Sequence, residues 1–140
     1  MATTFYRIAA VLLVLFAAAH TAGFLTFVPG PPEGVAVRDA MRSVVFLFGS
    51  KPANYQAMYN GFGLTVSAYL LFSAVLSWQL GTLAQTFAPV IARISWSFFA
   101  VQVATLVLCA IYFSAPQIIT AAIVAIVVGI ATLLVQRSSP

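Results

Sequence analysis

Charged residues are scarce in this sequence of 140 residues, which has six Lys and Arg and two Asp and Glu, 6% of the chain. Soluble domains average about 25% charged residues, so this chain has too few to cover a surface that faces water. With 63% hydrophobic residues, the apolar side chains must contact lipid as well as one another. The same composition excludes a disordered chain, which requires low hydrophobicity and high charge.

Cysteine and histidine occur once each, as Cys109 and His20. A single cysteine excludes an internal disulfide, a paired-thiol redox motif and a structural zinc site. A single histidine excludes haem held by two histidines. The sequence also lacks the glycine-rich nucleotide loops, the serine nucleophile elbow and the paired-histidine zinc motif. We therefore expect neither a metal site nor a cofactor.

The basic residues are spread along the chain and mostly flank apolar runs. Nucleic-acid binding requires a basic patch, so we expect no nucleic-acid partner and interpret these residues as anchors at a membrane interface. On the side of the two termini they are Arg7, Arg93 and Arg137, and on the other side Arg38, Arg42 and Lys51. Each side thus has three basic residues. We expect the bases of the long connection to be paired or buried and therefore to count less, which favours a cytoplasmic location for both termini. We expect a multi-pass protein of the inner (plasma) membrane.

Four apolar runs reach the about 20 residues that a membrane-spanning helix needs. The predicted spans are residues 8–28, 56–80, 90–113 and 117–136. The last two connections are short, which predicts antiparallel neighbours. The expected fold is therefore all-α, an integral membrane four-helix bundle in which residues 1–140 form a single transmembrane domain.

The connection between the first two spans is the only long one. Its apolar residues recur at roughly helical spacing between charged ones, which predicts an amphipathic interfacial helix over residues 34–48. Gly49 is expected to end this helix. Ser50 and Pro52 then predict the start of the next helix, as a capping serine and an early proline.

Polar residues within the spans indicate where a site could lie, because they are costly in lipid. His20 lies late in the first span and Asn60 early in the second, at similar depth, beneath the amphipathic segment. We expect a polar pocket there, with histidine as a proton donor or acceptor. The candidate catalytic residues are His20, Asp39 and Asn60. The candidate substrate-binding residues are Tyr55, Tyr59, Gln102, Tyr112, Glu33 and Arg42.

Such a pocket would bind a lipophilic small molecule that enters from the lipid bilayer. If the protein is an enzyme, the predicted chemistry is acid–base catalysis by an isomerase, cyclase or hydrolase. The alternatives are a structural or accessory membrane subunit, in which His20 only bonds a neighbouring helix, and a small transporter. A homo-oligomer is also left open, because Gly61, Gly63 and Gly129 could serve close helix contacts.

The string His20-Thr21-Ala22-Gly23, followed later by Asn60-Gly61-Phe62, resembles small bacterial four-helix membrane proteins that are mostly uncharacterised. This resemblance implies a four-helix fold and supplies no activity. The layout is also loosely similar to small membrane isomerases and cyclases of sterols or terpenoids. Those families typically carry acids within their spans, and this chain has none there.

Overall fold

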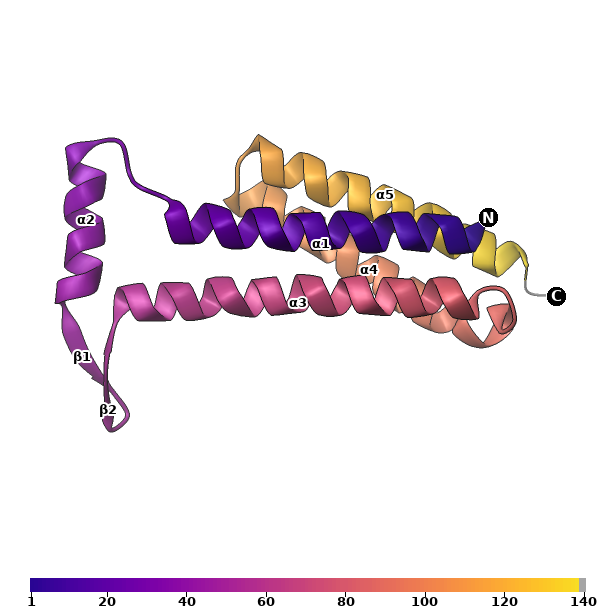
Figure 1. Ribbon diagram of the computed structural model, residues 1–140, viewed down its shortest axis with the longest axis horizontal. Helices are drawn as coiled ribbons and strands as arrows, with labels where there is room; N and C mark the ends of the chain where they lie inside the picture. The colour runs from indigo at the N-terminus through magenta and orange to yellow at the C-terminus, as the bar shows by residue number, and fades with distance from the viewer. Residues whose placement is uncertain (139–140) are drawn as a thin grey trace. The chain divides into compact units, whose positions relative to one another are not determined.

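The computed structural model describes residues 1–138. Within them the chain forms five helices and one two-stranded hairpin (Figure 1). In chain order these elements are α1 (Ala2–Thr26), α2 (Pro32–Ser43), β1 (Val45–Phe48), β2 (Lys51–Asn54), α3 (Tyr55–Leu83), α4 (Ala88–Tyr112) and α5 (Ala115–Arg137). Helices α1, α3, α4 and α5 overlap the four predicted spans and differ from them at their ends.

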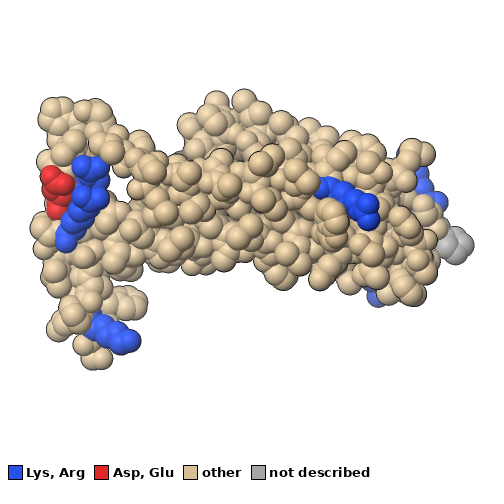
Figure 2. All heavy atoms as spheres, viewed as in Figure 1, with Lys and Arg blue, Asp and Glu red and all other residues tan. Residues whose placement is uncertain are grey.

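These four helices are long and apolar enough to cross a membrane. Their lengths are 25, 29, 25 and 23 residues, and at about 1.5 Å per residue each exceeds the about 30 Å of a bilayer's hydrocarbon. In each helix we consider the 18-residue segment that is most apolar, and at most 39% of this segment is buried within the protein. Figure 2 shows few charged residues on the visible face. The remaining apolar side chains therefore face lipid, and the chain is a multi-pass membrane protein.

The described chain divides into two compact units. The first contains residues 1–16 and the chain from Leu70 onward, and the second contains residues 17–69. The first unit thus holds the first part of α1, the second half of α3, and the whole of α4 and α5. The second holds the end of α1, α2, the hairpin and the start of α3.

The core of the first unit is built from small and branched side chains. Leu13, Leu80, Val128 and Val135 are almost fully buried. Helices α4 and α5 are joined by a short connection, and Gly129 of α5 lies so close to α4 that an added Cβ would be 2.8 Å from the Phe99 ring. Small residues permit this close approach between helices in a membrane.

A chain of buried polar contacts also joins the four helices of the first unit. The Ser77 hydroxyl donates to the Tyr6 carbonyl at 2.8 Å, which links α3 to α1. The Tyr6 hydroxyl lies 3.4 Å from Thr132 Oγ1 on α5. Thr132 Oγ1 lies in turn 3.3 Å from the Ser95 carbonyl on α4. Because lipid offers no competing partner, each buried polar group needs such a contact.

Aromatic residues with polar partners occur on the same unit. The Arg7 guanidinium lies 5.1 Å from the centroid of the Trp78 ring, within the range of a cation–π contact. The indole of Trp96 donates to Gln136 Oε1 at 3.0 Å. Tryptophan and arginine at helix ends are typical of the membrane–water interface.

The amphipathic helix is shorter than predicted. Helix α2 begins at Pro32, a favoured first helical position, with Glu33 in its first turn and Arg42 in its last, where each charge suits the helix dipole. It ends at Ser43, because Val44 is extended. The prediction of a helix over residues 34–48 is therefore wrong for its last part.

Residues 45–48 instead form β1, which pairs antiparallel with β2 from Val45↔Asn54 to Phe48↔Lys51. The loop between them has two residues, Gly49 and Ser50. Gly49 has a φ of +64°, which glycine adopts at no steric cost and which the first position of a tight hairpin turn requires. Aromatic and β-branched residues before this turn favour a strand over a helix.

The start of α3 also differs from the prediction. Ser50 and Pro52 lie in the hairpin, and the helix begins at Tyr55. Asn54 caps it, because its Oδ1 accepts the backbone N–H of Ala57 at 2.8 Å. Asparagine is among the best capping residues, since its side chain satisfies an otherwise free N–H of the first turn.

Candidate functional site

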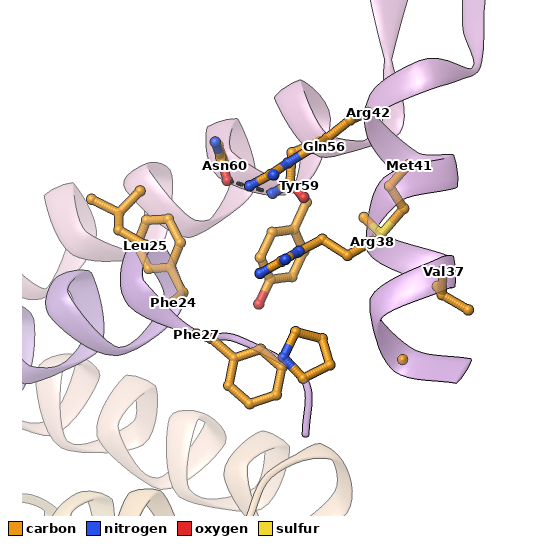
Figure 3. Close-up of a pocket in the computed structure, with 12 residues that line it drawn as sticks. Phe24, Leu25, Phe27, Val37, Arg38, Met41, Arg42, Gln56, Tyr59 and Asn60 are labelled. Carbon is orange, nitrogen blue, oxygen red and sulfur yellow. Dashed lines mark hydrogen bonds between the residues drawn. The ribbon is translucent and has the colours of Figure 1, made fainter. Parts of the chain in front are cut away.

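A cavity of about 430 Å³ lies in the second unit, where α2 faces the end of α1 and the start of α3 (Figure 3). This volume falls within the about 300–1,000 Å³ of typical small-molecule sites. The lining residues are Phe24, Leu25, Phe27, Pro29, Gly34, Val37, Arg38, Met41, Arg42, Gln56, Tyr59 and Asn60. They come from three short stretches of the chain, residues 24–29, 34–42 and 56–60.

The wall formed by the end of α1 and the residues that follow it is apolar and largely aromatic. The Phe24 ring contacts Tyr59 edge to face, with centroids 6.3 Å apart. It also lies against α3, because a Cβ on Gly63 would be 2.8 Å from it. Leu25 and Phe27 are more than half exposed. This side of the cavity therefore presents exposed apolar surface.

The opposite wall is basic. Arg38 and Arg42 are four residues apart and so share one face of α2. In Figure 3 their guanidinium groups extend from α2 towards Gln56, Tyr59 and Asn60. Within residues 1–138 neither arginine forms an ion pair, and the buried Nε of Arg38 has no hydrogen-bond partner.

The floor from α3 carries neutral polar groups. Gln56 Nε2 donates to Asn60 Oδ1 at 2.9 Å, a contact between successive turns of the helix. This bond uses Asn60 Oδ1 and leaves Asn60 Nδ2 as a donor and Gln56 Oε1 as an acceptor. The hydroxyl of Tyr59 adds a second donor. The cavity thus combines an apolar wall with several hydrogen-bond donors.

His20 lies beside this cavity but does not line it. Its Nε2 is 3.1 Å from the Gly63 carbonyl, and a carbonyl only accepts, so Nε2 carries the proton. A second contact lies next to this one. Thr21 follows His20 on α1, Ser67 lies one turn after Gly63 on α3, and Thr21 Oγ1 and Ser67 Oγ are 2.7 Å apart. Both contacts join α1 to α3. The ring centroid of His20 is 5.1 Å from that of Phe24, which connects it to the cavity wall.

Three of the nine predicted site residues line the cavity: Asn60, Tyr59 and Arg42. Glu33 and Asp39 are exposed on α2 and are not among the lining residues. Tyr55 is 53% exposed, and its ring contacts Phe46 of the hairpin at 4.7 Å between centroids. These last three residues belong to the same unit as the cavity without contributing to its wall.

Gln102 and Tyr112 belong to the first unit. Gln102 is buried in α4 with 2% of its surface exposed, and its Nε2 has no hydrogen-bond partner within the described residues. Tyr112, at the end of α4, is 73% exposed. Neither residue lines the cavity of the second unit.

Sequence reasoning did not select Arg38, Gln56 or Phe24 as site residues. A usable signal existed for Arg38, because its spacing of four from Arg42 places both on one face of a helix. Gln56 and Asn60 have the same spacing. Phe24 gave no signal, since apolar aromatic residues line lipid-facing and packed surfaces alike.

The chain matches no protein-family model, no curated protein and no solved structure. Its class therefore rests on its own features, which are those of a multi-pass membrane protein with four helices of spanning length. Within that class, the particular feature of this chain is the open cavity beneath a short helix that carries two arginines.

Proposed function

We propose that this membrane protein binds a lipophilic small molecule in the cavity formed by α1, α2 and α3. The observation that carries the proposal is the composition of the wall. Aromatic and aliphatic side chains from α1 face a few polar groups from α2 and α3, the arrangement typical of small-molecule sites. The exposure of Leu25 and Phe27 gives a ligand dissolved in the bilayer a route to this wall.

The position of α2 at the membrane interface is part of this proposal. No residue of α2 is buried, and the helix carries Glu33, Arg38, Asp39 and Arg42, which favours the boundary between lipid and water. If Arg38 and Arg42, which line the cavity, are left out of the count of bases, Lys51 remains on one side and Arg7, Arg93 and Arg137 on the other. This difference supports cytoplasmic termini in an inner membrane.

Acid–base chemistry by His20 stays a prediction. Its ring contacts Phe24, a residue of the cavity wall, but its Nε2 proton is used in the bond to Gly63. That bond supports the alternative role, in which the histidine holds α1 against α3. We therefore assign binding to the cavity and leave the isomerase, cyclase or hydrolase activity as a hypothesis that substitution of His20 tests separately.

Photolabelling tests the binding proposal directly. The purified protein in lipid nanodiscs is irradiated with oleyl alcohol that carries a diazirine in its chain, and the labelled residues are mapped by mass spectrometry. We expect labels on residues 24–29, 34–42 and 56–60. Unlabelled oleyl alcohol in excess should remove these labels and leave those on lipid-facing residues of α5.

A matched pair of variants controls for bulk. Met41→Trp places an indole in the cavity, whereas Ala40→Trp adds the same group at a neighbouring exposed position that does not line it. Met41→Trp should abolish the saturable labels and Ala40→Trp should keep them. Equal labelling in the two variants, or labels that excess alcohol does not remove, would contradict binding in this cavity.

A further inference from the structure

The cavity of the second unit is positively charged. Its lining includes Arg38 and Arg42 and no aspartate or glutamate. The only two acids of the chain, Glu33 and Asp39, are exposed on the same helix, and neither pairs with these arginines within residues 1–138. Two guanidinium groups therefore face the cavity without a protein counter-ion.

This arrangement is unfavourable unless something else supplies negative charge. Like charges four residues apart on a helix repel each other, and a partly buried cation loses hydration that only a partner restores. Arg38 is partly buried, and its Nε has no partner in the described chain. Three other polar residues line the cavity: the Tyr59 hydroxyl and Asn60 Nδ2 can donate hydrogen bonds, and Gln56 Oε1 can accept one. The two guanidinium groups and these donors suit an acceptor that carries negative charge.

We infer that the ligand is a lipophilic anion whose carboxylate or phosphate head binds between Arg38 and Arg42. The inference rests on the proposed function and adds the chemistry of the head group. Guanidinium forms paired, charge-assisted hydrogen bonds with both kinds of anion. The apolar chain of the ligand lies against Phe24 and Phe27 on one side of the cavity and Met41 of α2 on the other. In this orientation the polar head lies at α2 and the apolar chain extends towards α1. An amphiphile has the same orientation at a membrane–water interface.

A series of ligands with one chain and three heads tests this assignment. Oleate, oleyl phosphate and oleyl alcohol compete with the diazirine-bearing oleyl alcohol for the cavity labels. We expect at least one of the two anions to bind about tenfold or more tightly than the alcohol, the factor that one charged hydrogen bond supplies. The stronger of the two anions identifies the head group as a carboxylate or a phosphate.

Variants of the arginines connect this preference to the cavity. Arg38→Gln and Arg42→Gln should each reduce the anion's affinity to within about threefold of the alcohol's, the neutral head. Arg38→Lys should keep part of the preference, because it keeps the charge. Lys51→Gln removes a base of the hairpin that does not line the cavity, and it should leave the preference unchanged. Melting curves and gel filtration establish that each variant is folded.

The outcomes separate the two proposals. If the alcohol competes as well as both anions, or if the glutamine variants keep the tenfold preference, the anion inference is overturned, while saturable labelling of the cavity by the alcohol still supports the proposed function. If no ligand of the series labels or protects the cavity, the proposed function itself fails.

Discussion

Substitution of Gly63 by alanine tests the packing that positions the cavity wall. A Cβ at this position would lie 2.8 Å from Cε2 and Cζ of Phe24, so the ring must retreat by about 0.7 Å or more to reach an ordinary carbon–carbon separation. Overpacking of this kind costs about 1–3 kcal/mol. Alanine in a helix regains about 0.5–1 kcal/mol relative to glycine. We expect Gly63→Ala to be less stable than the wild type by roughly 0–2.5 kcal/mol, the difference between these two ranges.

Gly61 provides the matched control. It lies two residues earlier in α3, and a Cβ there meets nothing within 4 Å. Gly61→Ala should therefore show only the gain in helix stability, about 0.5–1 kcal/mol. The two variants should differ by about 1–3 kcal/mol, the cost of overpacking alone.

Unfolding by sodium dodecyl sulfate in mixed micelles, followed by circular dichroism, measures both free energies of unfolding under one condition. Because Phe24 lines the cavity, Gly63→Ala should also weaken the saturable labelling by the diazirine probe, whereas Gly61→Ala should not. If the two alanine variants have equal stability, or if Gly63→Ala is the more stable, the contact between Phe24 and α3 is not the constraint described here.

Two further substitutions test other parts of the fold by the same unfolding assay. Asn54→Ala removes the cap of α3 and should cost about 1 kcal/mol, whereas Asn54→Ser keeps a capping oxygen and should cost little; equal losses in the two variants would argue against the cap. Gln102→Met removes a buried donor that has no partner within the described residues and should stabilise the protein by about 1 kcal/mol. The same change at the exposed Gln79 should have no effect, and destabilisation by Gln102→Met would show that its amide is bonded.

The spanning helices were predictable because their signal is a single physical quantity, the length of an apolar run. The residues at which these helices begin and end were less predictable. The first predicted span begins at residue 8, whereas α1 begins at Ala2, because Thr3 and Thr4 are polar yet still form helical hydrogen bonds. Hydropathy locates the part of a helix that lies in hydrocarbon, and backbone bonding locates the whole helix.

The hairpin was missed because residues 44–48 satisfy two patterns. Their apolar side chains continue the helical spacing of α2, and they are also a β-branched and aromatic run before Gly49-Ser50. The second pattern predicts a hairpin with a two-residue turn. Local signals of this kind decide between helix and strand where periodicity alone does not.

The predicted site residues overlap in part with the residues that line the cavity. Polar residues at the start of the second span and charges in the long connection predicted a pocket in this region, and of the predicted residues Asn60, Tyr59 and Arg42 line the cavity. Which charged residue of α2 faces inward depends on how α2 docks, and tertiary packing decides this. The prediction chose Asp39, whereas its neighbour Arg38 lines the cavity.

The division of the chain into two units has a consequence for biosynthesis. Residues 17–69, which carry the whole cavity wall, are one continuous stretch, whereas the other unit combines residues 1–16 with the chain from Leu70 onward. During synthesis the ribosome completes the continuous stretch before it translates α4 and α5, so the cavity's residues are all present while the four-helix core still lacks two helices. The part of the protein that carries the cavity is thus the first part for which the nascent chain is complete.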